Sequence, residues 1–233
     1  MSTRNYKLDQ NFLRNSKLAL FLIGHSNIKK RDLVVEIGAG SGIITAALAK
    51  RCKKVIAIEK DLAVARKLKQ NLKRQQITNV EVWEGDFRRM KLPESPYKVF
   101  ANPPFSLSAE VFYKLLNLQN RAGKILERGM DLGRSPEAIY LILQKQLALK
   151  LIITERHYTS QLGKILTKYY STRIRLPLNS SDFTPPPKVP TVLFEAKKNT
   201  SGAIYETTLD QLQDSVQHNR NPNCCQTQKE DVG

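Results

Sequence analysis

The sequence has few cysteines and no long apolar segment. Only three of its 233 residues are cysteine, and two of them, Cys224 and Cys225, are adjacent near the end of the chain. This spacing makes no disulfide framework and no C-x-x-C pair, so we expect no metal site. The chain also lacks an 18-residue apolar run that could form a transmembrane helix, and its first residues lack the apolar core of a secretory signal. We therefore expect a cytoplasmic protein with reduced thiols and no membrane partner.

Acidic residues are scarce relative to basic ones. The chain has 38 Lys and Arg against 21 Asp and Glu, which leaves a formal net charge of +17. Such a surface attracts polyanions, so nucleic acid is the expected partner. A merely soluble basic surface is the alternative. The candidate segments for contacts with phosphates are residues 29–31, 66–74 and 88–91. We expect the chain to act as a monomer.

The order of apolar patterns predicts an α/β fold. Expected strands cover residues 33–37, 55–59, 79–84, 97–101, 138–143, 172–178 and 191–196, and expected helices cover 16–26, 43–50, 61–74, 106–118 and 158–169. This alternation predicts a parallel sheet with right-handed crossovers. Composition turns polar near residue 199. We expect one catalytic domain over residues 1–198, with an N-terminal arm over 1–15, and a short, partly helical and frayed region over 199–233.

A glycine-rich turn follows the first buried strand. Gly38, Gly40 and Gly42 alternate with other residues, and such a turn lets a ligand lie against bare backbone. A dinucleotide fingerprint would need glycine where Ile43 stands, which argues against NAD. Glu59 ends the next apolar run, where a carboxylate can accept both hydrogen bonds from a ribose diol. Together these features predict a nucleoside pocket without a pyrophosphate clamp, which suits S-adenosylmethionine.

An acidic residue also follows the third expected strand. Asp86 stands where it can accept the exocyclic amine of an adenine, and the neighbouring Phe87 can pack on the adenine ring. An aspartate that only caps a helix or a turn is the alternative.

The most informative tetrapeptide is N-P-P-F at residues 102–105. Its two prolines fix the backbone and remove donors, so Asn102 and the carbonyl of Pro103 can present acceptors to an incoming amine. Phe105 offers a plate on which an unpaired base can stack. A later proline-rich segment, residues 183–189, is stiff enough to hold Phe183 at a rim.

Six motifs occur in a familiar order. They are Q-N-F-L at 10–13, E-I-G-A-G-S-G at 36–42, A-I-E-K-D at 57–61, G-D at 85–86, N-P-P-F at 102–105 and F-T-P-P-P-K-V at 183–189. This combination resembles the Erm and KsgA group of ribosomal RNA adenine N6-methyltransferases over about residues 8–197. The resemblance implies a Rossmann-like class I S-adenosylmethionine methyltransferase sheet with a small helical C-terminal appendage.

The resemblance also implies roles for individual residues. The expected cofactor site consists of Asn11, Leu13, Gly38, Gly40, Glu59, Lys60, Asp86, Phe87 and Asn102. Asn102, Pro103 and Phe105 form the expected catalytic group, and Phe105 and Phe183 would hold the target base between them. The implied reaction is an in-line transfer of a methyl group from S-adenosylmethionine to adenine N6, with mono- and dimethylation both open.

The short region after the second proline motif resembles Erm more than KsgA. This implies 23S rRNA as the substrate and resistance to macrolides, lincosamides and streptogramin B. Three alternatives remain open. The first is a KsgA-like 16S rRNA dimethyltransferase, and the second is a DNA adenine N6-methyltransferase, of which N-P-P-F is also typical. The third is a non-catalytic relative that only binds nucleic acid.

Overall fold

A seven-stranded sheet forms the centre of the protein. The computed structural model describes residues 11–121, 124–126, 135–154 and 159–199. The strand order is β4-β3-β2-β5-β8-β11-β9. In chain order these strands are β2 (Leu33–Ile37), β3 (Lys54–Glu59), β4 (Val80–Glu84), β5 (Lys98–Ala101), β8 (Ala138–Gln144), β9 (Tyr170–Leu178) and β11 (Thr191–Lys198). The strands from β4 to β8 are parallel, and β11 runs antiparallel to both β8 and β9. The expected α/β class is confirmed.

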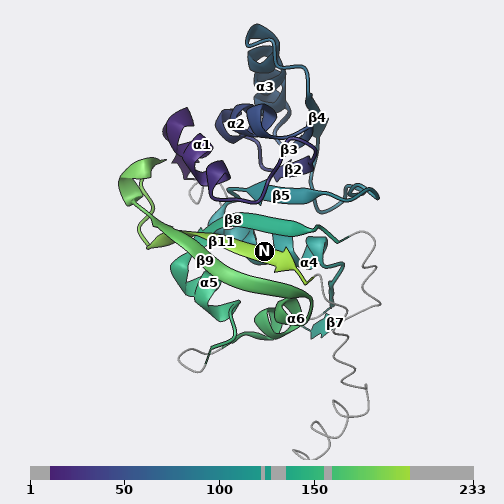
Figure 1. The fold of residues 1–233 in the computed structure, drawn as a ribbon, viewed down its shortest axis with the longest axis vertical. Helices are drawn as coiled ribbons and strands as arrows, with labels where there is room; N and C mark the ends of the chain where they lie inside the picture. Colours follow the sequence, from purple (N-terminus) through teal and green to yellow (C-terminus); the bar gives the residue numbers. More distant parts are fainter. Residues whose placement is uncertain (1–10, 122–123, 127–134, 155–158, 200–233) are drawn as a thin grey trace, which may run out of the picture. The chain divides into compact units, whose positions relative to one another are not determined.

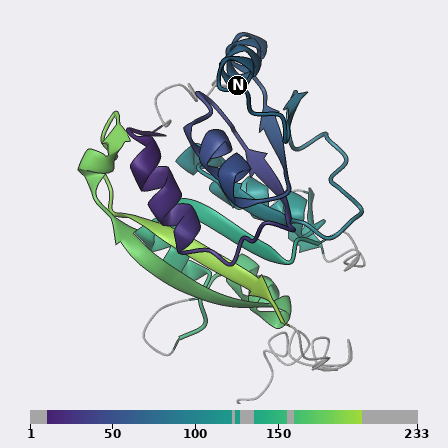
Figure 2. The same ribbon diagram turned by 45° about the horizontal axis from the view of Figure 1, so that its top comes forward.

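Helices cover both faces of this sheet (Figures 1 and 2). One face carries α1 (Ser16–Gly24), α2 (Ile43–Arg51) and α3 (Leu62–Arg74), and the other carries α4 (Ser108–Leu115), α5 (Lys145–Lys150) and α6 (Gln161–Tyr169). Successive strand residues serve opposite faces. Val34 packs in the cluster with α1 to α3, whereas Val35 packs in the cluster with α4 to α6, and neither is exposed. Because both faces are covered, the strands read as continuous apolar runs.

Short elements complete the described part of the chain. The 3-10 helices η2 and η3 cover Phe105–Leu107 and Ser180–Asp182, and a hairpin consists of β6 (Gln119–Arg121) and β7 (Lys124–Leu126). The sequence did not predict the hairpin, whose strands have only three residues each. No helix in the described ranges is long and apolar enough to cross a membrane.

The N-terminal arm is fixed by a strand pair that the sequence did not predict. β1 (Phe12–Leu13) pairs antiparallel with β10 (Phe183–Thr184). Leu13 lies opposite Phe183, and both side chains are buried. The expectation that Phe183 lies at a rim is therefore wrong: its side chain is 0% exposed and packs in the core on the α1 side of the sheet. Residues 1–10 and the predicted C-terminal region from residue 200 lie outside the described residues.

Candidate cofactor and catalytic site

A cavity lies where the carboxyl ends of β2, β3, β4 and β5 meet. The chain order reverses between β2 and β5, and open α/β sheets bind ligands at such a switch point. All nine residues predicted to bind the cofactor line the cavity: Asn11, Leu13, Gly38, Gly40, Glu59, Lys60, Asp86, Phe87 and Asn102. Pro103 also lines it, whereas Phe105 and Phe183 do not belong to its lining.

The glycine turn forms one wall of this cavity. The backbone N–H groups of Gly38 and Ala39 donate to the carbonyl of Ile58 at 2.9 and 3.1 Å, which holds the turn against β3. Gly38 has a φ of +75°, and a Cβ placed on it would meet no atom within 4 Å. Gly42 has a φ of +88°, and a Cβ there would lie 2.4 Å from Cδ1 of Leu68. Gly42 therefore serves packing, while Gly38 leaves open space in which a ligand can approach the backbone.

Glu59 is held by two backbone donors. Its Oε2 accepts a hydrogen bond from the N–H of Gly40, and its Oε1 accepts one from the N–H of Asp61, both at 2.9 Å. A carboxylate oxygen can accept two hydrogen bonds. Each oxygen of Glu59 thus keeps acceptor capacity for a ribose hydroxyl, and the carboxylate is already oriented. This geometry fits the role expected from the sequence.

Asp86 is engaged by an arginine that sequence reasoning did not place in the site. Nε of Arg88 donates to Oδ1 of Asp86 at 2.9 Å, and Nη2 donates to Oδ2 at 2.5 Å. The hydrogen bonds from Arg88 hold the pKa of Asp86 down at about 2. Arg88 also donates through Nη1 to Oε2 of Glu110 on α4 at 2.8 Å. Because Arg88 occupies both oxygens, Asp86 can accept an adenine amine only by sharing them or by displacing the guanidinium.

Asn102 is oriented by the N-terminal arm. Its Nδ2 donates to the carbonyl oxygen of Asn11 at 2.7 Å. Asn102 Oδ1 therefore remains an acceptor with no partner among the described residues, and the residue lines the cavity. The carbonyl of Pro103 likewise accepts no hydrogen bond in the part of the chain that the structure describes. Asn102 and Pro103 follow β5 directly, and both line the cavity, so each can offer an acceptor to an amine there.

The structure shows where two aromatic residues, Phe105 and Phe12, lie relative to the cavity. Phe105, the last residue of the N-P-P-F motif, begins η2 and is partly exposed, and its stacking role stays a prediction. Phe12 is 44% exposed and lines the cavity. Its Cε1 lies 3.4 Å from the position that a Cβ on Gly40 would occupy. The Q-N-F-L motif contained this aromatic residue, but only the pairing of β1 with β10 shows that it faces the cavity.

A buried carboxyl group lies behind the glycine turn. Glu36 on β2 is 1% exposed, and neither of its side-chain oxygens has a hydrogen-bond partner. Burial raises the pKa of Glu36 to about 8; the nearby polar groups of Thr45 oppose this rise, and the negative charge of Glu59 adds to it. Oγ1 of Thr45 on α2 is also buried without a hydrogen-bond partner. Within the described ranges, no group of three or more His, Cys, Asp or Glu residues could hold a metal ion.

The fold and the cavity define a Rossmann-like class I methyltransferase. The match to a family model is more specific, because the model described as "Ribosomal RNA adenine dimethylase" matches residues 1–218. The chain belongs to this family, and the family assignment makes S-adenosylmethionine the cofactor. The open space at Gly38 and the oriented carboxylate of Glu59 fit its methionine and ribose parts.

Curated relatives of this chain are named as ribosomal RNA methyltransferases. The "Probable ribosomal RNA small subunit methyltransferase A" of Methanosphaera stadtmanae is 30% identical over 195 residues, which cover 82% of this chain and 66% of the relative. The "rRNA adenine N-6-methyltransferase" of Bacteroides fragilis is 30% identical over 193 residues, covering 81% of this chain and 65% of the relative. The chain thus spans slightly less than two thirds of the length of these relatives.

Two solved structures of methyltransferases have folds similar to that of this chain. A dimethyladenosine transferase from Plasmodium falciparum gives a TM-score of 0.66 at 27% identity, covering 81% of this chain and 63% of that one. The 23S rRNA methyltransferase ErmE gives a TM-score of 0.72 at 21% identity, covering 89% and 78% of the two chains. The ErmE similarity supports the fold alone.

Proposed function

We propose that this protein transfers methyl groups from S-adenosylmethionine to N6 of adenine in ribosomal RNA. The observation that carries the proposal is the hydrogen bond from Nδ2 of Asn102 to Asn11, which leaves Asn102 Oδ1 as an acceptor in a residue that lines the cavity together with Pro103. An exocyclic amine has two N–H donors, and Asn102 Oδ1 and the carbonyl of Pro103 match them. The family assignment supplies the substrate class.

The two acceptors address the main chemical difficulty of the reaction. The lone pair of an adenine amine is delocalised into the ring, so the amine is a poor nucleophile. If Asn102 Oδ1 and the Pro103 carbonyl accept its two N–H groups, they favour a pyramidal nitrogen and aim its lone pair at the methyl group. Positioning of this kind can lower a barrier by several kcal/mol, within the ~7–11 kcal/mol available to ideal orientation. When bound, S-adenosylmethionine supplies the methyl group as an electrophilic sulfonium.

The remaining cavity residues would hold the cofactor in line with the amine. Glu59 would accept hydrogen bonds from the ribose, and the open space at Gly38 would admit the methionine part. Asp86 would read the cofactor's adenine amine after Arg88 shares or yields its hydrogen bonds. The target base must leave its stack to reach Asn102. Phe105, partly exposed next to the motif, is the side chain that we propose to stack on it.

For the RNA itself, we propose adenine N6 in 23S rRNA, with resistance to macrolides, lincosamides and streptogramin B as its consequence. The greater resemblance to Erm than to KsgA after the second proline motif favours this target, and the name of the Bacteroides fragilis relative supports methylation of adenine N6 in rRNA. The second candidate is an adenine of small-subunit rRNA, which the name of the Methanosphaera stadtmanae relative favours.

Transfer of labelled methyl groups distinguishes these targets. The acceptors are protein-free 23S rRNA, intact 50S subunits, 30S subunits and duplex DNA, with product nucleosides identified by mass. Label in N6-methylated adenosine from protein-free 23S rRNA alone is the expected result. Label only in 30S subunits would establish the small-subunit target, and label only in DNA would overturn the RNA assignment. If no acceptor is labelled while rRNA still binds tightly, the protein is a non-catalytic RNA-binding relative.

A further inference from the structure

A dense group of basic side chains lies at the amino-terminal ends of β2 and β3, whereas the cavity lies at their carboxyl ends. Seven exposed residues form this amino-end basic surface: Lys29, Lys30, Arg31, Lys50, Arg51, Lys53 and Lys54. They come from two short segments, one before β2 and one that runs from the last turn of α2 to the first residue of β3. Of the residues in this surface, the sequence suggested only 29–31 as a candidate phosphate contact, because the second segment joins them only in the fold.

Hydrogen bonds join the two segments into one surface. The backbone N–H of Lys53 donates to the carbonyl of Asp32 at 2.9 Å. The Nζ of Lys30 donates to the carbonyl of Lys50 at 2.6 Å, and Nε of Arg51 donates to the carbonyl of Ile28 at 3.3 Å. These contacts hold the basic side chains close together in spite of their mutual repulsion.

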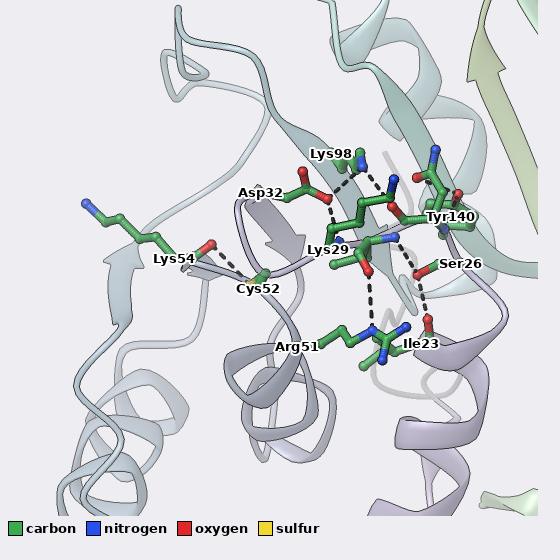
Figure 3. Close-up of polar contacts among 11 residues, drawn as sticks. Ile23, Ser26, Lys29, Asp32, Arg51, Cys52, Lys54, Lys98 and Tyr140 are labelled. Atoms are coloured by element: carbon green, nitrogen blue, oxygen red, sulfur yellow. Dashed lines mark hydrogen bonds and ion pairs between the residues drawn. The ribbon is translucent and has the colours of Figure 1, made fainter.

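The acidic residue in these segments does not neutralise the exposed cations. The carboxylate of Asp32 pairs with Nζ of Lys98 at 2.6 Å, and both side chains are almost buried, at 10% and 7% exposure. Figure 3 shows Lys98 and the backbone of Lys29 converging on Asp32. Lys98 also donates to the carbonyl of Asn27 at 2.8 Å. The charge of Asp32 is therefore compensated from inside the protein.

Four cations of the surface remain available to a partner. Lys54 pairs with Glu81, and Lys30 and Arg51 bind backbone carbonyls. The side chains of Lys29, Arg31, Lys50 and Lys53 make no hydrogen bond or ion pair within the described part of the chain. Lys50 lies in the last turn of α2, where a cation stabilises the helix dipole. Lys29, Arg31 and Lys53 lie outside any helix, so the dipole does not account for them.

We infer that the amino-end basic surface is a second RNA contact, which binds phosphates of a substrate segment remote from the methylated base. This inference rests on the proposed function for the identity of the polyanion. The two segments contain no exposed large apolar side chain that could enter a lipid surface, which favours RNA over a membrane. A five-residue strand is about 16 Å long, so the surface and the cavity lie at least that far apart. An RNA that contacts both must therefore extend at least this far from the methylated base, which is about five base pairs of a duplex.

The test removes two of the available charges and compares RNAs of two sizes. The variant Lys29→Gln/Lys53→Gln spares every hydrogen bond described above. Its matched control is Lys150→Gln/Lys164→Gln, which removes two exposed lysines from α5 and α6 on the other side of the sheet. The RNAs are full-length rRNA and a short hairpin carrying the adenine that the methyl-transfer assay identifies. Binding is measured over a range of salt concentrations, and methylation is measured at saturating RNA.

We expect Lys29→Gln/Lys53→Gln to weaken binding of full-length rRNA by about five- to tenfold and to lower the salt slope by about 1.4–1.8, as for two lost phosphate contacts. Affinity for the hairpin, its methylation rate and cofactor affinity should stay at wild-type values. The control variant should keep rRNA affinity, salt slope, hairpin affinity, methylation rate and cofactor affinity close to their wild-type values.

Three results would overturn the inference. The first is equal weakening by the test and control variants, which would indicate a general charge effect. The second is an equal loss of hairpin affinity, which would place the surface next to the cavity. The third is loss of binding to phosphatidylserine vesicles with unchanged rRNA binding, which would assign the surface to a membrane. If rRNA binding depends on the amino-end basic surface but no methyl transfer occurs, the proposed enzymatic function is refuted while the proposed RNA contact is supported.

Discussion

The side-chain nitrogen of Asn102 donates a 2.7 Å hydrogen bond to the backbone carbonyl of Asn11. This bond joins the catalytic motif to the N-terminal arm, which is itself fixed by the pairing of Phe12 and Leu13 with Thr184 and Phe183. The arm therefore orients the Asn102 amide so that its nitrogen is used as a donor and its oxygen remains available as a hydrogen-bond acceptor. Segments far apart in the sequence thus orient the side-chain oxygen that we propose as an acceptor for the incoming amine.

Replacement of Asn102 by Ala should lower the rate of methyl transfer far more than the affinity for the cofactor. We expect kcat to fall by about 10²–10³-fold, as for the loss of one preorganised polar group at a reaction centre. Asn102→Asp should be similarly impaired, because a carboxylate cannot donate to Asn11. Methyl transfer to rRNA gives the rate, and calorimetric binding of S-adenosylhomocysteine gives the control. A variant that retains wild-type kcat would remove Asn102 from the mechanism.

The sequence predicted the elements of this site better than their contacts. Short apolar runs located β2 through β5, and the glycine spacing located the turn, because both depend on local backbone and burial. The position of Phe183 was predicted wrongly, since the proline-rich context suggested a stiff rim, whereas β1 pairing places the ring in the core. Long-range pairing of two-residue strands leaves no periodic signal in a sequence.

Charge partners were also beyond sequence reasoning. Asp86 was expected at the cavity and lies there, but its bidentate partner Arg88 was expected only to contact phosphates. Side-chain direction after a turn depends on backbone angles that residue types do not fix. The same holds for Lys98, whose pairing with Asp32 joins β5 to the loop before β2.

Replacement of Glu59 by Gln should weaken the cofactor complex. The two oxygens of Glu59 face the N–H groups of Gly40 and Asp61, so a glutamine amide group must oppose one donor with another. Hydrogen bonds to a charged group contribute ~1.5–3 kcal/mol, which corresponds to about a ten- to hundredfold loss of affinity. Calorimetry with S-adenosylhomocysteine measures it. Glu84→Gln is the matched control, because Glu84 ends the neighbouring strand in register with Glu59 and is exposed. Equal affinities for the two variants would contradict a ribose contact at Glu59.

Two glycines of the same turn should respond differently to alanine. Gly42→Ala places a methyl group against Leu68 at a positive φ, so the free energy of unfolding should fall by about 2–4 kcal/mol through strain and overpacking. Gly38→Ala meets no protein atom and should cost only about 1–2 kcal/mol for its φ, but its methyl group should enter the cofactor's space. Denaturant unfolding and cofactor calorimetry separate the two effects. If Gly38→Ala bound the cofactor as well as wild type, the ligand would not pass along this backbone.

The buried carboxyl of Glu36 should give stability an unusual dependence on pH. In the unfolded chain a glutamate loses its proton near pH 4.3, whereas in the folded protein burial raises the pKa of Glu36 to about 8. Between these values the folded state holds a proton that the unfolded state has released. The free energy of unfolding therefore falls as pH rises through this range and levels off above the folded pKa.

The substitution Glu36→Gln removes the ionisable group and keeps the shape of the side chain. The free energy of unfolding of this variant should therefore not fall between about pH 4.3 and pH 8 as it does in the wild type. The variant and wild type should differ least near pH 4.5, and the variant should become progressively the more stable of the two toward pH 8. Urea unfolding at half-unit steps of pH measures the difference. Glu137→Gln, an exposed carboxyl replacement just before β8, is the control and should keep the wild-type slope. Parallel curves for wild type and Glu36→Gln would show that Glu36 is ionised in the folded protein, and a hydrogen-bond partner for its carboxylate would then have to exist.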